Sequence, residues 1–470
     1  MTKRTRAMGG TAASGAGGAA VPGAGGVGGA ATPGPGTAQG AARSGPASAG
    51  GPASKAATAN TDRPAPGTST APEPQGSAAQ ASKPTTPKKA TATSKTPVKK
   101  ATPAKAVTPA LTLDPRALNR ATLHRQLLLH RSPMSAKDAV AHLVGLQAQN
   151  VKPPYYALAA RLDGFVPQEL SALVAEREVV RIVTMRSTIH AHTADDCLTL
   201  RPLVQPARDR ELKNFRKGLG GVDLERLAAL ARDLVEDEPR TMRQLREALS
   251  AEWPDADPRA LSIAARCKLP LVQVTPRGLW GRSGQVALTT AEHWLGRPAE
   301  PASAPDATVL RYLTGFGPAS VKDMQTWAGL TRLRDAFERL RPELVTFRDT
   351  HGVELFDLPD APRPDPDTPA PPRFLPEYDN LLLSHADRTR VVPAEYRGRT
   401  WQGNLAHCTF LVDGFLAGVW KLADDTLTVE PFGTLTKAQR DAVTAEAARM
   451  LGVMHPERSY HVRFGTVIRP

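Results

Sequence analysis

The same order of short elements recurs three times between Leu118 and Leu358, and this repetition limits the fold more than any other feature of the chain. Each time, two or three short amphipathic segments lead into two extended segments with a turn between them. Helices this short are marginal alone, so each group must pack against its strands or its neighbours. Helices followed by a hairpin are typical of a winged helix-turn-helix, and the sequence therefore predicts about three such units in tandem.

Helix caps and turn residues define the expected elements. Ser135 and Thr241 precede amphipathic segments as N-caps, and Pro258 stands in the first turn of another. The expected helices span 118–129, 136–146, about 168–176, 241–253, 258–269, 307–317, 319–330 and 332–340. The expected extended segments span 179–193, 270–290 with Pro276 and Gly278 at its tip, and 343–358 with a turn at His351-Gly352.

Beyond a Pro/Asp-rich linker, residues 400–432 alternate apolar and polar side chains and turn at Asp413-Gly414 and Asp424-Asp425. This pattern predicts a small antiparallel sheet, closed by a helix over 437–451. The expected fold class is α+β, and a generic α+β protein with several hairpins is the alternative. The expected domains are a tail at 1–110, winged-helix units at 113–235, 236–300 and 301–360, and a β-rich segment with its closing helix at 373–470.

Composition separates residues 1–110 from the rest. Ala, Gly, Pro, Ser, Thr and Lys dominate this tail, so it cannot bury enough apolar surface to offset the entropy of ordering, and we predict that it is disordered. It holds 13 of the 60 Lys and Arg residues but 2 of the 46 Asp and Glu residues, so most of the formal net charge of +14 lies there. Such a tail can neutralise DNA phosphates without folding. A solubilising or wrongly assigned N-terminal extension is the alternative.

Several protein classes are disfavoured. No run approaches the roughly 20 apolar residues of a membrane span, and no apolar N-terminal segment suggests secretion, so we expect a cytoplasmic, nucleoid-associated protein with no membrane partner. Cys197, Cys267 and Cys408 are far apart, which indicates neither a disulfide framework nor a zinc site. No phosphate-binding GxxxxGK[ST] stretch is present. We expect no metal and no cofactor, and a monomer is favoured.

The stretch 145-GLQAQN-150 places two glutamines two residues apart, shortly before Pro153 and Pro154. In a helix such a pair points about 200° apart, whereas in extended or turn geometry both side chains share a side. The prolines favour a helix end just beyond the motif. Gln147 and Gln149 are then either part of a site or solvated residues at the C-terminus of a helix.

A second constellation alternates with period two in the first extended segment: Arg186, Thr188, His190 and His192. On a strand these side chains line one face. They either belong to a site or tie the strand to neighbouring helices. A metal site is a minor alternative, since no carboxylate or cysteine partner is apparent.

Five segments in fixed order carry a family resemblance: LQAQ at 146–149, MRSTIH at 185–190, FGPASVKDMQTW at 316–327, FLPEYDNLLLSHADR at 374–388 and VDGFLAGVW at 412–420. Together they resemble the winged-helix DNA glycosylases of the AlkZ/YcaQ-like family, over residues 113–470. The resemblance implies tandem winged helices around a positively charged channel. It also implies removal of alkylated bases from double-stranded DNA, including bases in interstrand crosslinks. Gln147-Ala148-Gln149 matches the AlkZ-type Gln-apolar-Gln branch, whereas the other branch ends this motif with Asp.

The resemblance implies that Gln147 and Gln149 are catalytic and that Arg186, Thr188 and His190 support the active site. Thr188 and His190 are expected to orient the glutamines, and Arg186 is expected to contact a DNA phosphate. The chemistry is consistent, because a purine alkylated at N7 or N3 is already cationic and leaves with little protonation. Carboxamide oxygens can then hold the attacking water while positive charge develops on the sugar. No nucleophilic lysine is evident at the motif, so we expect a monofunctional enzyme. A Schiff base on Lys152 is the alternative.

DNA contacts are expected mainly from the second repeat, where five basic residues lie on its second helix and its hairpin: Arg259, Arg266, Lys268, Arg277 and Arg282. Three further candidates lie in the third repeat: Lys322, Arg332 and Arg334. Each also fits an ordinary solvated charge. Phe374, Tyr378 and Asp379 are expected to pack the linker against the helices, with a role beside the site as the alternative.

The function indicated is a monofunctional DNA glycosylase that hydrolyses the N-glycosidic bond of alkylated purines. The alternative is a non-catalytic winged-helix protein that binds DNA as a regulator or a nucleoid-associated factor, since fold alone does not imply function. The sequence leaves open whether the lesion is a methyl group, a bulky adduct or a crosslink.

Overall fold

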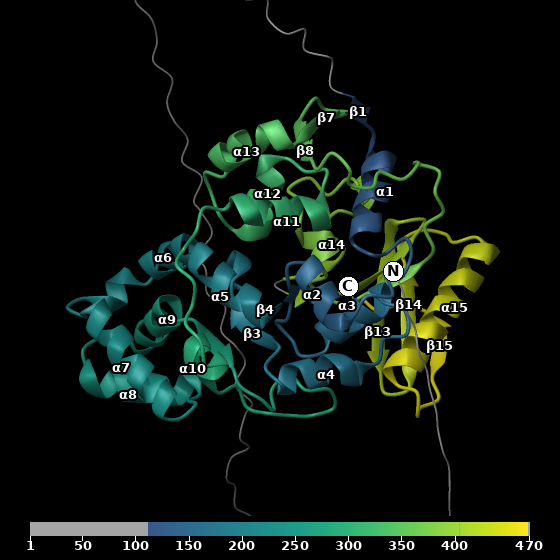
Figure 1. The fold of residues 1–470 in the computed structure, drawn as a ribbon. Helices are drawn as coiled ribbons and strands as arrows, with labels where there is room; N and C mark the ends of the chain where they lie inside the picture. The colour runs from purple at the N-terminus through teal and green to yellow at the C-terminus, as the bar shows by residue number, and fades with distance from the viewer. Residues whose placement is uncertain (1–110, 404, 469–470) are drawn as a thin grey trace, which may run out of the picture. The chain divides into compact units, whose positions relative to one another are not determined.

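The computed structural model describes residues 111–403 and 405–468, which form an α+β chain with small sheets and many short helices (Figure 1). The tail at 1–110, for which the sequence predicts disorder, lies outside the described residues. Within the described ranges no helix is long and apolar enough to cross a membrane. Short 3-10 helices span Met185–Ser187 (η1), Arg216–Leu219 (η2), Arg341–Glu343 (η3) and Ala394–Tyr396 (η4).

A five-stranded antiparallel sheet joins the first and second repeats. Its order is β2-β4-β3-β5-β6. The strands span Leu146–Gln147 (β2), Val179–Val183 (β3), Ile189–Thr193 (β4), Leu271–Gln273 (β5) and Leu288–Thr290 (β6). The register places Gln147 and Ile182 on either side of His190. Strands from both expected units therefore share one set of hydrogen bonds rather than forming separate wings.

The first repeat contains α1 (Pro115–Arg125), α2 (Ala136–His142), α3 (Pro153–Arg161) and α4 (Pro167–Ala175). The expected helices at 118–129 and 136–146 end four residues too late, at Leu129 and Leu146. Gly145 explains the second error, because its φ is +89° and an added Cβ would lie 2.3 Å from His192 Nδ1. Pro153 and Pro154 open α3, a helix that the sequence did not predict, instead of following a helix end.

A helical group follows the first hairpin, with α5 (Ala194–Leu203), α6 (Gln205–Lys213), α7 (Leu224–Asp237), α8 (Met242–Glu252), α9 (Pro258–Lys268) and α10 (Ala291–Leu295). Helices α8 and α9 match the expected pair, with a Thr241 capping box and Pro258 in the first turn of α9. Helix α9 packs against α6, α7 and α8 around one apolar cluster. The expected hairpin at 270–290 is correct only at its ends, because β5 and β6 are joined by the long loop 274–287.

The third repeat follows its sequence pattern closely. It contains α11 (Asp306–Phe316), α12 (Val321–Ala328), α13 (Arg334–Leu340), β7 (Val345–Asp349) and β8 (Glu354–Asp357). Strands β7 and β8 are antiparallel around the expected turn, where Gly352 has a φ of +77°. The short β1 (Thr112–Leu113) adds to β7 in parallel.

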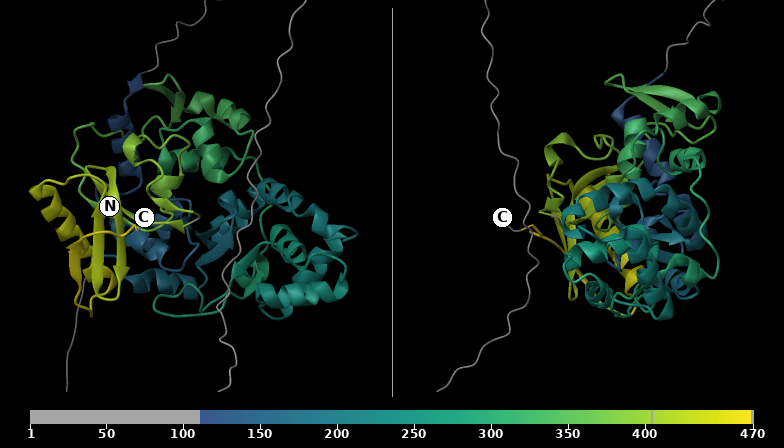
Figure 2. Two further views of the ribbon diagram at one scale, coloured as in Figure 1. Left: turned by 180° about the vertical axis from the view of Figure 1, so that it is seen from behind. Right: turned by 90° about the vertical axis from the view of Figure 1, so that its left-hand side faces the viewer.

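The C-terminal part is a five-stranded sheet with a covering helix. Its order is β15-β14-β13-β12-β9. The elements are β9 (Arg373–Leu375), α14 (Asn380–Leu383), β10 (Trp401–Gln402), β11 (Leu405–Ala406), β12 (Cys408–Val412), β13 (Phe415–Ala423), β14 (Thr426–Pro431), α15 (Lys437–Met454) and β15 (His461–Phe464). Figures 1 and 2 show α15 beside this sheet. Apolar residues of α2, α3, α4, this sheet and α15 form one buried cluster, so the first and last parts of the chain share a core.

Candidate active site

The glutamine motif lies on extended backbone. Gln147 ends β2, and the Ala148 N–H continues the pairing by donating to the Ile189 carbonyl at 2.7 Å. Residues two apart on extended backbone share a side. Gln147 is 6% exposed, whereas Gln149 is exposed and its Oε1 accepts from the Ile189 N–H at 3.4 Å. The motif therefore begins on a strand and continues into a bend at Gln149, and it is not a helix C-terminus.

Arg186 lies in the η1 turn between β3 and β4. The expectation that Arg186, Thr188, His190 and His192 all lie on one strand is wrong, because only the two histidines belong to β4. Reversal of the chain between the strands puts Arg186 in left-handed geometry with φ at +53°, a conformation that few non-glycine residues adopt. Helix α12 packs against this turn, since a Cβ on Gly329 would lie 2.9 Å from the Arg186 backbone nitrogen.

The Arg186 guanidinium orients Gln147. Its Nη2 donates to Gln147 Oε1 at 2.8 Å, and its Nη1 donates to the Trp327 carbonyl. Arginine only donates hydrogen bonds, so the Gln147 atom that faces it must be the amide oxygen. Among the described residues the Gln147 amide NH₂ has no partner, and Oε1 keeps a second lone pair. Gln147 therefore has both a donor and an acceptor available for a water molecule or a substrate.

His190 is buried and fixes the other side of Arg186. Its Nδ1 lies 3.0 Å from the Thr188 carbonyl, an acceptor, so this nitrogen carries the proton and donates. Its Nε2 then accepts from Arg186 at 3.2 Å. Burial lowers the pKa of His190 well below its usual value, and the charge of Arg186 lowers it further. His190 is thus a neutral imidazole in one tautomer, and the Thr188 carbonyl rather than its hydroxyl joins the network.

Arg181, which the sequence did not single out, supports the motif from β3. Its side chain is 3% exposed, and Nη2 donates to the Ala148 carbonyl at 2.8 Å while Nη1 donates to the Asn150 carbonyl at 3.3 Å. Burial lowers the pKa of Arg181 to about 10. Carbonyls rather than a carboxylate therefore satisfy this buried cation, and the backbone between the two glutamines is held in place.

The segment 374-FLPEYDN-380 supports the motif from the other direction. Asn380 Nδ2 donates to the Gly145 carbonyl at 2.8 Å, and Glu377 accepts from Asn150 Nδ2 at 3.0 Å. Both residues were missed in the sequence, although this segment was one of the five that carried the family resemblance.

Of the three residues of this segment that were expected to pack the linker against the helices, Asp379 forms an ion pair with a helix of the repeats, whereas the ring contacts of Phe374 and Tyr378 are with the C-terminal part. Phe374 is buried against Phe410 and Trp420. Asp379 forms a two-bond ion pair with Arg161, at 2.7 and 2.8 Å, with both side chains fully buried. The Tyr378 ring lies 5.8 Å from the Trp401 ring.

The candidate DNA-binding residues of the second repeat do not join the glutamine motif. Arg266 pairs with Glu211 at 2.7 Å, and Lys268 pairs with Glu225 at 2.6 Å, so both cations on α9 already have carboxylate partners. Three others are distributed around this region: Arg259 and Arg282 are exposed, and Arg277 is half-buried beside the Gly284 carbonyl.

The loop around Pro276 and Gly278, which was expected to be the tip of a hairpin, is attached to the first repeat. Tyr155 of α3 donates to the Gly278 carbonyl at 2.6 Å, and the Trp280 N–H donates to Ser171 of α4 at 3.0 Å. The described residues contain no cluster of three or more His, Cys, Asp or Glu side chains that could hold a metal ion. The groups that the structure places around the motif are the two glutamine amides, the His190 imidazole, the Arg186 guanidinium and the Glu377 carboxylate beside Asn150.

Comparisons with known proteins show which family and which fold the chain resembles. A family model described as "DNA glycosylase AlkZ-like" matches residues 140–453. An interstrand DNA cross-link repair glycosylase from Streptomyces sahachiroi is 26% identical over 361 residues, which cover 70% of this chain and 93% of that protein. The solved structure of the Streptomyces sahachiroi DNA glycosylase AlkZ superposes with a TM-score of 0.65 at 20% identity, covering 76% of this chain and all of that one. At that identity the structural match shows a shared fold.

Proposed function

Because the chain belongs to the family of AlkZ-like DNA glycosylases, we propose that it hydrolyses the N-glycosidic bond of alkylated purines in double-stranded DNA, with Gln147 and Gln149 as the catalytic pair. The observation that carries the proposal is the hydrogen bond from Arg186 to Gln147 Oε1 on extended backbone. This bond orients the buried amide of Gln147, and the exposed Gln149 follows two residues later with its Oε1 beside the Ile189 N–H. If the two glutamines were solvated residues at a helix end, a hydrogen bond from a buried arginine would not be needed to orient Gln147.

The substrate explains why amides suffice. Alkylation at N7 or N3 makes the purine cationic, so the base departs as a neutral leaving group without an acid catalyst. Positive charge then develops on the sugar, and preorganised dipoles that face this charge lower the barrier. The amide oxygens of Gln147 and Gln149 accept hydrogen bonds from a water held below the sugar. The water attacks C1′ as the bond breaks, the neutral base leaves with the bonding electrons, and the proton of the new hydroxyl passes to bulk water.

Arg186, Thr188 and His190 are positioning residues in this proposal. His190 uses both ring nitrogens for hydrogen bonds within the protein and is neutral, so it does not transfer the proton itself. The charge of Arg186 polarises the Gln147 amide while fixing its direction. The enzyme is monofunctional in this proposal, because no lysine hydrogen-bonds either glutamine among the described residues.

We propose crosslinked purines as a second class of substrate, since the curated relative from Streptomyces sahachiroi is an interstrand DNA cross-link repair glycosylase. The three repeats proposed at 113–235, 236–300 and 301–360, the first two joined by one sheet, would carry the DNA together with the β-rich segment at 373–470. The exposed Arg259 and Arg282 fit backbone contacts better than Arg266 and Lys268, whose charges are already paired. The basic tail would add sequence-independent affinity and keep the protein on chromosomal DNA.

The test is base release from a duplex that carries one N7-alkylguanine, compared for the intact protein and its Gln147→Ala and Gln149→Ala variants. We expect either change to slow single-turnover release by about two to three orders of magnitude, while circular dichroism and the thermal unfolding midpoint stay near those of the intact protein. A duplex with a purine crosslink tests the second substrate.

The competing function is sequence-specific DNA binding without chemistry. If the intact protein binds both substrates and releases no base above the spontaneous rate, the catalytic proposal is wrong. A marked preference for one undamaged duplex sequence would then support a regulator.

A further inference from the structure

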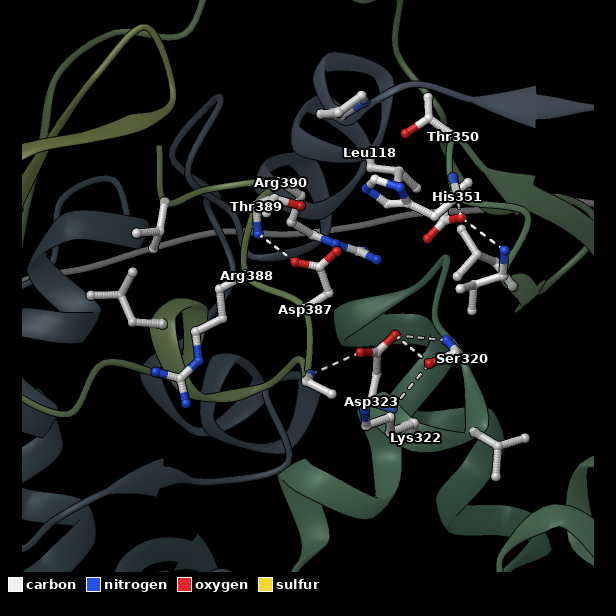
Figure 3. Close-up of a pocket in the computed structure, with 18 of the residues that line it drawn as sticks. Leu118, Ser320, Lys322, Asp323, Thr350, His351, Asp387, Arg388, Thr389 and Arg390 are labelled. Carbon is white, nitrogen blue, oxygen red and sulfur yellow. Dashed lines mark hydrogen bonds between the residues drawn. The ribbon is translucent and has the colours of Figure 1, made fainter. Parts of the chain in front are cut away.

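A cavity of about 870 Å³ lies outside the glutamine network. It is bordered by the start of α12, the β7–β8 turn and the chain from Ala386 to Trp401 (Figure 3). The polar and charged residues that line it include Ser320, Lys322, Asp387, Arg388, Thr389 and Arg390. The sequence singled out only Lys322 among these, as one of several candidate DNA contacts.

Arg388 is a half-buried cation of this cavity. Among the described residues its side chain has no carboxylate or other hydrogen-bond partner. The neighbouring Asp387 does not form an ion pair with Arg388. Its carboxylate accepts from the Thr389 N–H at 2.9 Å and points away from Arg388 (Figure 3). Burying a charge without a partner is unfavourable, so an anion supplied from outside would stabilise this arrangement.

Two other arginines differ from Arg388 because their guanidinium groups hydrogen-bond within the protein. Arg390 donates to the Pro318 carbonyl at 2.8 Å, and Arg186 donates to Gln147 at 2.8 Å. Helix α12 connects the cavity to the glutamine network, because Lys322 near its start lines the cavity and the Trp327 carbonyl near its end accepts from Arg186. The charge of Arg388 also lowers the pKa of Arg186, which burial already lowers. An anion bound at Arg388 would relieve this repulsion and would lie next to the network that orients Gln147.

We propose that the cavity at Arg388 binds a backbone phosphate of the damaged DNA strand, beside the nucleotide whose base is removed. The inference rests on the proposed function for its choice of ligand. A guanidinium matches a phosphate with two parallel hydrogen bonds, and phosphate contacts fix the position of DNA on a protein without reading sequence. Lys322, exposed on α12 at the same cavity, supplies a second positive charge. Arg388 thereby sets the distance between the strand and Gln147.

The test compares the full-length intact protein with Arg388→Gln and Arg388→Lys. The probe is a duplex with one tetrahydrofuran abasic analogue, and its binding is followed by fluorescence anisotropy across a salt series. We expect Arg388→Gln to lower affinity about tenfold to a hundredfold and to reduce the slope of log K against log salt by about 0.9, as for one lost phosphate contact. Arg388→Lys should keep the slope but lose part of the affinity, because a point charge cannot replace the two-bond fork.

The matched control is Arg243→Gln, which removes an exposed arginine of α8 that pairs only with Glu247. It should change neither affinity nor slope. All variants are checked by thermal unfolding, and single-turnover release from N7-alkylguanine DNA is measured at saturating protein. We expect Arg388→Gln to slow that step as well, because a loosely held strand misplaces the sugar relative to Gln147.

The outcomes distinguish failure of the phosphate site from failure of the proposed function. An unchanged affinity and slope in Arg388→Gln would overturn the phosphate site even if the intact protein releases base normally. If the intact protein releases no base while the slope still depends on Arg388, the proposed function fails and the phosphate site stands. Inorganic phosphate that displaces the duplex more strongly than chloride at equal ionic strength, and only when Arg388 is present, would reassign the site to free phosphate.

Discussion

The Arg186 guanidinium donates a 2.8 Å hydrogen bond to the side-chain oxygen of Gln147, a residue 39 positions earlier in the chain. The same nitrogen donates to His190, so one cation links the strand that carries the glutamine to the strand beside it. The orientation of the amide therefore depends on a turn that is itself held by α12 through the Trp327 carbonyl and the close approach of Gly329.

Replacing Arg186 should separate positioning from substrate binding. Arg186→Lys keeps the positive charge but removes the planar guanidinium that donates hydrogen bonds to both Gln147 and His190. We expect single-turnover base release to slow about tenfold to a hundredfold, with little change in the affinity for abasic-analogue DNA. Arg210→Lys is a control, since Arg210 also donates to a carbonyl beside this turn but does not touch the glutamine. Equal rates in the intact protein and Arg186→Lys would remove Arg186 from the catalytic arrangement.

Buried neutral histidines should make the stability of the fold depend on pH. Burial lowers the pKa of His192 to about 4, and that of His190 lies well below its usual 6.5. The unfolded chain binds protons near pH 6.5 and the folded chain does not, so this contribution is fully present above pH 6.5 and is lost as the pH falls toward 4. Each histidine should decrease the free energy of unfolding by about 1.4 kcal/mol per pH unit in that window.

The measurement is urea denaturation of the intact protein and His192→Asn between pH 5 and 8. The variant should show the shallower decline below pH 6.5 because it lacks one titrating ring. If the free energy of unfolding falls with pH equally in both proteins, His192 has the same pKa in the folded and the unfolded chain, and the prediction is wrong.

Gly145→Ala tests the close approach that ends α2. A methyl group at this position meets His192 Nδ1 at 2.3 Å, and the φ of +89° is unfavourable for any other residue. We expect a loss of about 1–3 kcal/mol in the free energy of unfolding, together with slower base release because Gln147 follows two residues later. Gly164→Ala has a similar φ of +68° but open space around it, so it measures the backbone strain alone.

The Asp379 and Arg161 pair should be essential for stability. Both side chains are fully buried, and removing one partner leaves an uncompensated charge inside the protein. Asp379→Asn should therefore lower the free energy of unfolding by about 3–5 kcal/mol, measured by urea denaturation. The exposed pair of Lys437 and Asp441 gives the comparison, and Asp441→Asn should change stability by less than about 0.5 kcal/mol. Similar losses in the free energy of unfolding for Asp379→Asn and Asp441→Asn would contradict an essential role for the buried pair.

Deleting residues 1–110 should affect binding more than chemistry. The tail carries most of the positive charge, so its removal should reduce the salt dependence of DNA affinity. Single-turnover release at saturating protein should stay nearly unchanged. Loss of that chemistry in the truncated protein would show that the tail and the folded part do not act as separate modules.

The sequence by itself determined the features that depend on near neighbours. The Thr241 cap, Pro258 in the first turn of α9 and the turn at Gly352 all follow from preferences that act over a few residues. The ordered motifs indicated the family, and the spacing of Gln147 and Gln149 required a backbone other than a regular helix.

Only the tertiary structure decided what surrounds the glutamines. Arg181 holds the Ala148 carbonyl, Asn380 holds the Gly145 carbonyl from 235 residues away, and Arg186 lies in a turn rather than on the expected strand. The pairing of β2 with β4 and the shared core of α3 with the C-terminal sheet likewise join distant segments. Local preferences cannot choose such partners, because the partners are selected by how buried surfaces and hydrogen-bonding groups are satisfied together once the whole chain has packed.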